Sequence, residues 1–179
     1  NKWLKDNLEN LANEGISSYC LTGLQNESSG VVKMDGLGGQ PITNRFVAFT
    51  DDMNVVLSAA DLVVSRAGAG AISELIRCRI PSILIPYPYA ADNHQFLNAE
   101  FVEKKGGAIL CPEEKIPSDL LDEIKEVMFN EEFRTILRRN LYALDSGDVA
   151  NRISEDLCQF LKAESEKGQI RKGVLRFVG

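Results

Sequence analysis

Hydrophobic residues follow two different spacings along this chain. Continuous apolar runs, which are typical of buried strands, occupy residues 16–21, 45–49, 62–65, 82–85 and 108–110. Between these runs, and after the last of them, apolar residues recur every three or four positions, which predicts helices. The helical patterns comprise Trp3, Leu4, Leu8 and Leu11 before Gly15; Met53, Val56 and Leu57; Ile72, Leu75 and Ile76; Phe96, Leu97 and Phe101 before Gly106; Leu120 to Met128; and residues 131–144 and 148–163.

Local signals bound several of these elements. Pro81 is expected to break the helix that carries Ile72. The polar, Gly-rich stretch 25–40 predicts a loop or a small hairpin. Side chains suited to capping a helix precede three of the helical patterns, namely Asp51 or Asp52, Asp92 or Asn93, and Ser118.

Strands that are apolar on both faces and alternate with helices favour a parallel sheet covered on both sides. The expected fold is therefore α/β, a Rossmann-like doubly wound domain over residues 1–165. Residues 166–179 form a basic tail or linker, in which Lys167, Arg171, Lys172 and Arg176 follow Glu166 without another acid. In such folds ligands bind beyond the carboxyl ends of the strands, so the loops after Phe49, Val64 and Ile85 are expected to converge.

Composition excludes several classes of function. The 179 residues carry a net charge of −6, which argues against nucleic-acid binding and against docking on anionic lipid. No apolar run approaches the ~20 residues of a membrane span. Four widely spaced cysteines predict free, buried thiols in a reducing cytosol, and a single histidine predicts no metal site.

The stretch from Ser65 to Glu74, SRAGAGAISE, follows a predicted strand and opens a helix. Glycines let a backbone approach a ligand closely, and a helix start offers free N–H groups to an anion. Arg66 could add a charged contact to phosphate, and Glu74 could accept hydrogen bonds from the two ribose hydroxyls. A second interpretation stays open: a tight turn in which Glu74 only complements the helix dipole.

A dinucleotide site is a further alternative for this stretch. Residues 68–73 depart from the G-x-G-x-x-G pattern at its last position, which is Ser73. The acidic residue expected about 20 positions later is also missing, because residues 86–90 contain no acid. Both departures argue against a dinucleotide.

Two more strand-to-helix loops carry polar groups. Residues 86–95, PYPYAADNHQ, supply donors and acceptors suited to sugar hydroxyls, although a capped loop in which His94 supports the helix start fits the same residues. Residues 49–53, FTDDM, end one strand and begin a helix, where backbone groups could contact a base; alone they are a capping signature.

Together these three stretches resemble the carboxy-terminal domain of the MurG family, UDP-N-acetylglucosamine transferases that act on the lipid-linked muramoyl-pentapeptide precursor of peptidoglycan. The resemblance runs from about Arg45 to Leu161 and is best in F-x-D-D-M, in A-D-L-V-V-S-R-A-G-A-G-A-I-S-E and in Y-A-A-D-N-H-Q-x-x-N-A. It implies the donor-binding half of a two-domain glycosyltransferase of the GT-B type. The acceptor, the membrane contact and the general base are then expected on an amino-terminal domain outside this sequence, and the protein is expected to be cytoplasmic, peripheral on the inner membrane.

The resemblance also implies roles for individual residues. Thr50 is expected to offer backbone contacts to uracil, Glu74 to bind the ribose, and Gln95 to bind the N-acetylglucosamine hydroxyls, with Asn93 and His94 nearby. The residues expected around the pyrophosphate and nucleotide are Arg66, Gly68, Ala69, Gly70, Ala71, Ile72 and Ser73. No metal and no cofactor is implied.

The sequence departs from the family at several positions. His94 stands where some relatives have Gln, and Gly70 and Ala71 replace bulkier or hydroxylated residues. A Gly-rich phosphate loop expected before the first helix is absent from this sequence, so the chain alone is expected to be inactive. Two alternatives stay open: a related GT-B transferase with another UDP-sugar and a glycolipid acceptor, and a non-catalytic nucleotide-binding module.

Overall fold

A computed structural model describes residues 1–24, 29–145, 147 and 149–166. The chain forms two compact units, residues 1–145 and 146–179. The described part of the second unit is essentially one helix, α8 (Val149–Glu166), which carries exposed Ile153, Leu157, Phe160 and Leu161. Beyond Glu166, the predicted basic tail lies outside the described residues. The predicted domain limit at residue 165 remains a prediction.

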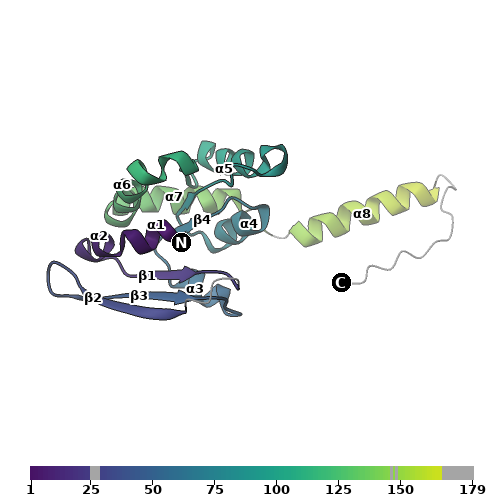
Figure 1. Ribbon diagram of the computed structural model, residues 1–179. Coiled ribbons are helices and arrows are strands. Elements are labelled where there is room, and N and C mark those ends of the chain that lie inside the picture. Colours follow the sequence, from purple (N-terminus) through teal and green to yellow (C-terminus); the bar gives the residue numbers. More distant parts are fainter. Residues whose placement is uncertain (25–28, 146, 148, 167–179) are drawn as a thin grey trace. The chain divides into compact units, whose positions relative to one another are not determined.

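The first unit is α/β with parallel strands, as predicted (Figure 1). In place of one continuous sheet, the described strands form two sheets of three strands. The first has the order β1-β3-β2, in which β1 (Ser18–Leu21) is parallel and β2 (Gly30–Asp35) antiparallel to β3 (Pro41–Val47). The second is fully parallel, with the order β4 (Val63–Ser65), β5 (Ser82–Leu84) and β6 (Ile109–Leu110).

The antiparallel pair corresponds to the small hairpin that was one of the two expectations for residues 25–40, and it is larger than expected because β3 begins at Pro41 rather than at Arg45. Gly39 lies in the turn with φ 73°, a conformation that few residues other than glycine adopt. A side chain on Gly36 would come within 2.8 Å of the Ala12 carbonyl oxygen, so glycine lets the turn pack against the preceding helix.

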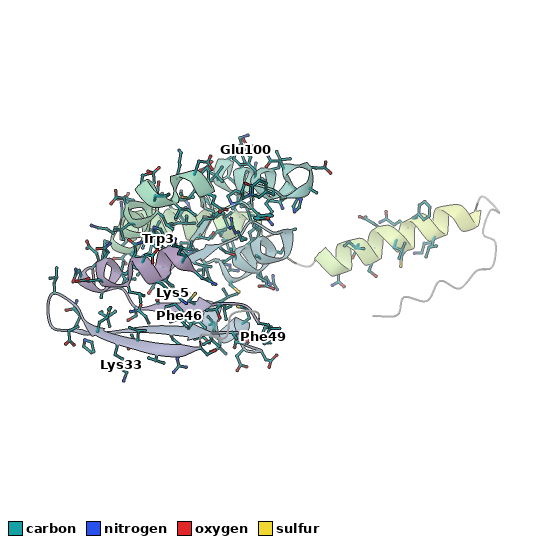
Figure 2. The ribbon with its side chains drawn as sticks, in the orientation of Figure 1. Trp3, Lys5, Lys33, Phe46, Phe49 and Glu100 are labelled. Atoms are coloured by element: carbon teal, nitrogen blue, oxygen red, sulfur yellow. The ribbon has the colours of Figure 1, made fainter. Side chains whose placement is uncertain are left out.

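The expected first helix is interrupted. The chain forms α1 (Lys2–Asp6) and α2 (Leu8–Asn13), and Asn7 between them leaves the helical conformation at φ −118°. Its side-chain Nδ2 donates to the Trp3 carbonyl at 2.9 Å, an example of an asparagine side chain competing with the backbone for a partner. Below α1, the Lys5 ammonium lies 5.8 Å from the centre of the Phe46 ring of β3 (Figure 2).

Two helix starts also differ from expectation. Asp52 stands at the N-cap position before Met53, but its side chain does not make the predicted cap hydrogen bond. Helix α6 (Ile116–Phe129) begins before Ser118, because Pro117 suits the first turn of a helix and needs no N–H partner there. Ser118 donates instead to the Lys115 carbonyl at 3.2 Å. The other helices are α3 (Met53–Ser58), α4 (Ala69–Cys78), α5 (His94–Lys104) and α7 (Glu131–Leu144), with short 3₁₀ turns η1 (Ala91–Asn93) and η2 (Glu113–Lys115).

Helices cover both faces of the parallel sheet. Leu84 packs on one face with residues of α4, α5 and α7, including Leu75, Val102 and Leu141. Ile83, the next residue along β5, packs on the other face with Leu11 and Ile124 of α2 and α6. This layering is the doubly wound arrangement that continuous apolar strands require.

The four cysteines are free. Cys111 is buried and Cys20 is partly exposed, whereas Cys78 and Cys158 are exposed, so the expectation of buried thiols was wrong for the latter two. Both exposed cysteines lie in helices, α4 and α8, on faces that the described residues leave open. Among the helices of the described residues, none combines the length and apolar character needed to cross a bilayer.

Candidate functional site

Three loops meet where the parallel strands end. Because β4, β5 and β6 run in the same direction, the segments that follow Ser65, Leu84 and Leu110 leave the same edge of the sheet. They lead into α4, α5 and η2 respectively. This edge therefore collects polar groups from positions far apart in the sequence, as the Rossmann-like prediction required.

Arg66, directly after β4, joins all three strand ends. Its Nη1 donates to the Pro86 carbonyl at 3.1 Å and approaches the Ile85 carbonyl at 3.4 Å, both just after β5. The same nitrogen lies 2.7 Å from Oε2 of Glu113, after β6. The guanidinium carbon lies 5.5 Å from the centre of the Tyr87 ring, within the range of a cation–π contact.

The start of α4 presents free backbone donors. Gly68 is the N-cap residue, with φ −68° and ψ 146°, and its carbonyl accepts the first helical bond from the Ile72 N–H at 3.0 Å. The N–H groups of Ala69, Gly70 and Ala71 precede that bond and so have no partner within the helix. No side chain caps this end, and a Cβ built on Gly68 or Gly70 would meet nothing within 4 Å. The helix start is therefore open to an anion.

The remaining predicted residues of α4 differ in exposure. Ile72 is buried at 8% exposure in the hydrophobic core, which leaves only its backbone to face a ligand. Ser73 is exposed, and its hydroxyl donates to the Ala69 carbonyl at 2.9 Å. Glu74 is exposed too, and within the described part of the chain its carboxylate has neither a hydrogen bond nor an ion pair. Glu74 is thus available to a ligand one turn into the helix.

The loop before α5 is held in an unusual conformation. Asp92 and Asn93 both have positive φ, 50° and 53°, a region that Asp and Asn tolerate better than most residues. Asn93 occupies the N-cap position by place, but neither it nor Asp92 makes the predicted side-chain cap. A residue whose side chain caps a helix usually has extended backbone. Asn93 has left-handed backbone instead, so its side chain is not placed to cap α5.

His94 and Gln95 fasten the same loop. Nδ1 of His94 lies 2.7 Å from the Ala91 carbonyl, and since a carbonyl only accepts, Nδ1 carries the hydrogen. Oε1 of Gln95 accepts from the Tyr87 N–H at 3.0 Å, which leaves the Gln95 amide NH₂ to donate elsewhere. The ring of Tyr87 in turn lies edge-on to that of Tyr89, with the ring centres 5.7 Å apart.

Asn98 joins the second loop to the first. Its Nδ2 donates to the Ala67 carbonyl at 3.2 Å, directly before the start of α4. Asn98 and Glu113 are two members of this constellation that the motifs did not single out as site residues. Glu113 could have been found from its place after the last predicted strand, because that position belongs to the same sheet edge.

Thr50 lies apart from this network. It sits in the loop between β3 and α3, where its Oγ1 accepts from the Asp52 N–H at 3.1 Å. No hydrogen bond or ion pair among the described residues links Thr50 to α4 or α5. Phe49 beside it is 61% exposed and projects from the end of the sheet (Figure 2).

The site is an open edge rather than an enclosed cavity. A shallow cavity of about 320 Å³ elsewhere is lined by Asn1, Lys2, Lys5, Asp6 and Thr22, none of which belongs to the strand-end loops. Within the described residues, no three His, Cys, Asp or Glu side chains gather as metal ligands would. The chemistry available here is hydrogen bonding and one cation beside a helix N-terminus.

Comparison with known proteins shows the family of this chain. The model of the glycosyltransferase family 28 C-terminal domain matches residues 2–152. A curated relative from Opitutus terrae, a UDP-N-acetylglucosamine--N-acetylmuramyl-(pentapeptide) pyrophosphoryl-undecaprenol N-acetylglucosamine transferase, is 39% identical over 168 residues, covering 94% of this chain and 44% of that protein. A relative of the same name from Aquifex aeolicus is 47% identical over 89 residues, or 49% of this chain and 26% of that protein.

The chain spans less than half the length of these two relatives. Among solved structures, the crystal structure of Acinetobacter baumannii MurG is similar over 56% of this chain and 28% of that one, with 29% identity and a TM-score of 0.48.

Proposed function

The chain belongs to the glycosyltransferase family 28 C-terminal domains, and on that premise we propose that it binds the UDP-N-acetylglucosamine donor of a transferase that builds the peptidoglycan precursor. The acceptor in this proposal is the lipid-linked muramoyl-pentapeptide. In this proposal that acceptor, the membrane contact and the general base are assigned to a part of the full-length enzyme other than this chain, which covers 44% of the Opitutus terrae relative. The chain by itself is then expected to bind donor without transferring the sugar.

The observation that carries the proposal is the uncapped start of α4. Three consecutive N–H groups, those of Ala69, Gly70 and Ala71, have no partner within the helix and stand at its positive dipole end. The open space at Gly68 and Gly70 lets a diphosphate approach that backbone closely. Such a helix start binds phosphate without a metal, which suits a donor whose leaving group is UDP.

Glu74 supplies the ribose contact in this proposal. Its carboxylate has no partner among the described residues and lies one turn beyond the phosphate-binding backbone. A carboxylate accepts two hydrogen bonds from vicinal hydroxyls, so it selects a ribose over a deoxyribose. Thr50 is assigned to uracil through its backbone, on the family resemblance alone.

In this proposal the loop before α5 and the first turn of α5 bind the sugar. Gln95 uses its oxygen to hold Tyr87, and its NH₂ remains to donate to a sugar hydroxyl. His94 donates from Nδ1 to Ala91, so Nε2 is the ring nitrogen that faces other partners. Asn93 precedes both at the N-cap position of α5. These groups fit hydroxyl recognition, and N-acetylglucosamine is assigned from the family.

The reaction proposed for the full-length enzyme is a direct displacement with inversion at the anomeric carbon. The acceptor hydroxyl loses its proton to a base and attacks, while the bond to the UDP oxygen breaks. The charge that develops on UDP is stabilised by the α4 donors. This chain would therefore contribute to catalysis by stabilising the UDP leaving group.

An NMR titration of the labelled chain tests the proposal. UDP-N-acetylglucosamine, UDP-galactose and NAD are added in turn, and millimolar affinity, about 4 kcal/mol, is sufficient for detection. Saturable shifts at Gly68, Gly70 and Glu74 with the UDP compounds support donor binding, and stronger shifts with N-acetylglucosamine at Gln95 support the assigned sugar. A response to NAD without one to UDP compounds contradicts the proposal and favours a nucleotide-binding module of another kind. An equal or stronger response to UDP-galactose favours a transferase with a different donor.

A further inference from the structure

One carboxylate is paired with the arginine that precedes the proposed anion site. Glu113 Oε2 is 2.7 Å from Nη1 of Arg66, and Arg66 is two residues before the N-cap of α4. Arg66, the cation that the family resemblance assigns to the pyrophosphate, is therefore already paired with an anion of the protein itself. The pair joins β4 to β6 across 47 positions of sequence, so it is a feature of the fold and not of one loop.

Nη1 of Arg66 is held by protein acceptors, whereas the other guanidinium nitrogens of Arg66 remain open to a ligand. Nη1 of Arg66 also faces the carbonyls of Ile85 and Pro86, so this single nitrogen meets three acceptors with only two hydrogens. Among the described residues, Nη2 and Nε of Arg66 have no partner. The side chains of Arg66 and Glu113 are 48% and 44% exposed, so a dissolved anion can reach both.

A diphosphate bound at α4 would meet both charges. It would gain from the free donors of Arg66 and would be repelled by Glu113, since an interaction between charges scales with their product. Free UDP carries more negative charge than UDP-N-acetylglucosamine, because its terminal phosphate loses a second proton near neutral pH, whereas the sugar ester cannot. Repulsion by Glu113 is therefore stronger for the product than for the donor.

From this geometry we propose that Glu113 is a specificity-determining residue that weakens the binding of free UDP more than that of the UDP-sugar. It acts through Arg66 and by its own charge, and it favours exchange of spent UDP for fresh donor. The proposal rests on the proposed function, because it requires a diphosphate at α4. It assigns to Glu113 a role separate from holding the strand ends together, which a neutral side chain of the same size can do.

The experiment compares variants of the 179-residue chain. Glu113→Gln keeps the size and one acceptor oxygen but removes the charge, and Glu113→Asp keeps the charge. Glu114→Gln is the matched control, since Glu114 is the next residue of η2, is exposed, and is not paired with Arg66. Dissociation constants for uridine, UDP and UDP-N-acetylglucosamine are measured at about pH 8, where the terminal phosphate is fully ionised, at low and high salt.

The expected result is a change graded by ligand charge. Glu113→Gln binds UDP about two- to fivefold more tightly than the wild type, the range for an exposed ion pair. The gain for UDP-N-acetylglucosamine is smaller, about 1.5- to threefold, and that for uridine is absent. The gains shrink at high salt. Glu113→Asp remains close to the wild type, and Glu114→Gln changes the constants less than Glu113→Gln does.

Two failures can be told apart. If the wild type binds UDP compounds but Glu113→Gln binds UDP no better, or gains equally for uridine, the role of Glu113 is overturned while donor binding stands. If no variant binds any UDP compound, the proposed function fails and the inference fails with it. Thermal unfolding of each variant shows whether the strand ends remain assembled, and a large loss of stability in Glu113→Gln alone would assign Glu113 a structural role instead.

Discussion

The side-chain amide of Asn98 donates a hydrogen bond to the main-chain carbonyl of Ala67, with 3.2 Å between Nδ2 and the oxygen. Ala67 is fully buried and comes directly before the N-cap of α4, whereas Asn98 lies in the second turn of α5. The bond therefore ties the proposed phosphate-binding helix start to the helix whose preceding loop is proposed to bind the sugar. This contact links the two halves of the proposed donor site.

Replacing Asn98 by Ala should cost both stability and affinity. The buried carbonyl of Ala67 loses its side-chain partner, which should lower the free energy of unfolding by about 1–2 kcal/mol. The start of α4 should become less well positioned, and UDP should bind about fivefold more weakly, the equivalent of about 1 kcal/mol. Urea unfolding and a UDP titration measure the two effects.

Asn140 provides the matched control for this prediction. Its Nδ2 donates to the Gly106 carbonyl at 2.9 Å, the same kind of bond at the other end of α5. Asn140→Ala should lose similar stability and keep its UDP affinity. Equal losses of affinity in both variants would mean that the Asn98 effect is general destabilisation, not positioning.

Glu74 should matter for binding and not for folding. Because its carboxylate is exposed and has no partner among the described residues, Glu74→Gln should unfold at the same denaturant concentration as the wild type. A hydrogen bond to a charged group contributes about 1.5–3 kcal/mol, so UDP affinity should fall about 10- to 100-fold. The wild type should prefer UDP to 2′-deoxy-UDP, and the variant should lose that preference.

Glu132→Gln is the control for Glu74, since Glu132 is an exposed carboxylate in the first turn of α7 and lies outside the site. It should leave UDP binding unchanged. An unaltered preference for ribose in Glu74→Gln would remove Glu74 from the ribose site and return it to the simpler role of complementing the helix dipole.

Gly70 offers a test that separates folding from ligand approach. A Cβ at this position meets nothing within 4 Å, and alanine is a better helix former than glycine. Gly70→Ala should therefore stabilise the protein by up to about 1 kcal/mol while it weakens UDP binding, because the methyl group occupies the space through which the diphosphate reaches the backbone. In Gly70→Ala the unfolding temperature should rise, whereas the affinity for UDP measured by titration should fall.

Gly30, in β2, is also open around its Cβ and lies on the other sheet, so Gly30→Ala controls for the loss of a glycine as such. Should Gly70→Ala bind UDP as tightly as the wild type, the diphosphate does not approach the backbone at residue 70.

Much of the architecture could be predicted from the sequence because it depends on local patterns. The limits of α7 were predicted as observed from its regular apolar spacing, and the structure adds a cap at its start: the Asn130 side chain accepts from the Phe133 N–H at 3.0 Å. The continuous apolar run of β5 correctly indicated burial on both faces, with Ile83 at 0% and Leu84 at 1% exposure.

Features decided by single polar side chains or by distant partners could not be predicted this way. The break at Asn7 depends on a side chain choosing the Trp3 carbonyl, a choice that apolar spacing does not record. Asp92 and Asn93 have positive φ and make no side-chain cap, and the bond between Gln95 and Tyr87 joins residues eight positions apart, a contact that a capping pattern does not record.

The candidate site divides in the same way. The glycines of α4 and Glu74 belong to one local motif, and their places follow from the strand-to-helix pattern. The partners of that motif do not: Asn98 reaches Ala67 across 31 positions and Glu113 reaches Arg66 across 47. Such pairs depend on the order of strands in the sheet, which the sequence pattern leaves open.

Glu123 of α6 should make stability depend on pH in the acid range. Burial raises the pKa of its carboxyl above the ordinary 4.5, and the nearby carboxylates of Asp119 and Glu126 raise it further. Because the folded chain holds this proton at a higher pH than the unfolded chain, stability falls as the pH rises from the unfolded pKa to the folded pKa, and the cost is complete above the folded pKa. Below about pH 4 both states are protonated and the cost vanishes.

Glu123→Gln should therefore stabilise the protein at pH 7 by about 0.5 kcal/mol, the scale of a like-charge pair on a helix, and by nothing at acid pH. Asp61→Asn, which removes an exposed carboxylate outside α6, is measured in parallel as the control for the loss of a negative charge as such. Thermal unfolding at both pH values decides the matter: a gain for Glu123→Gln that persists at acid pH would arise from packing, and a loss at pH 7 would mean that the charged carboxylate stabilises α6.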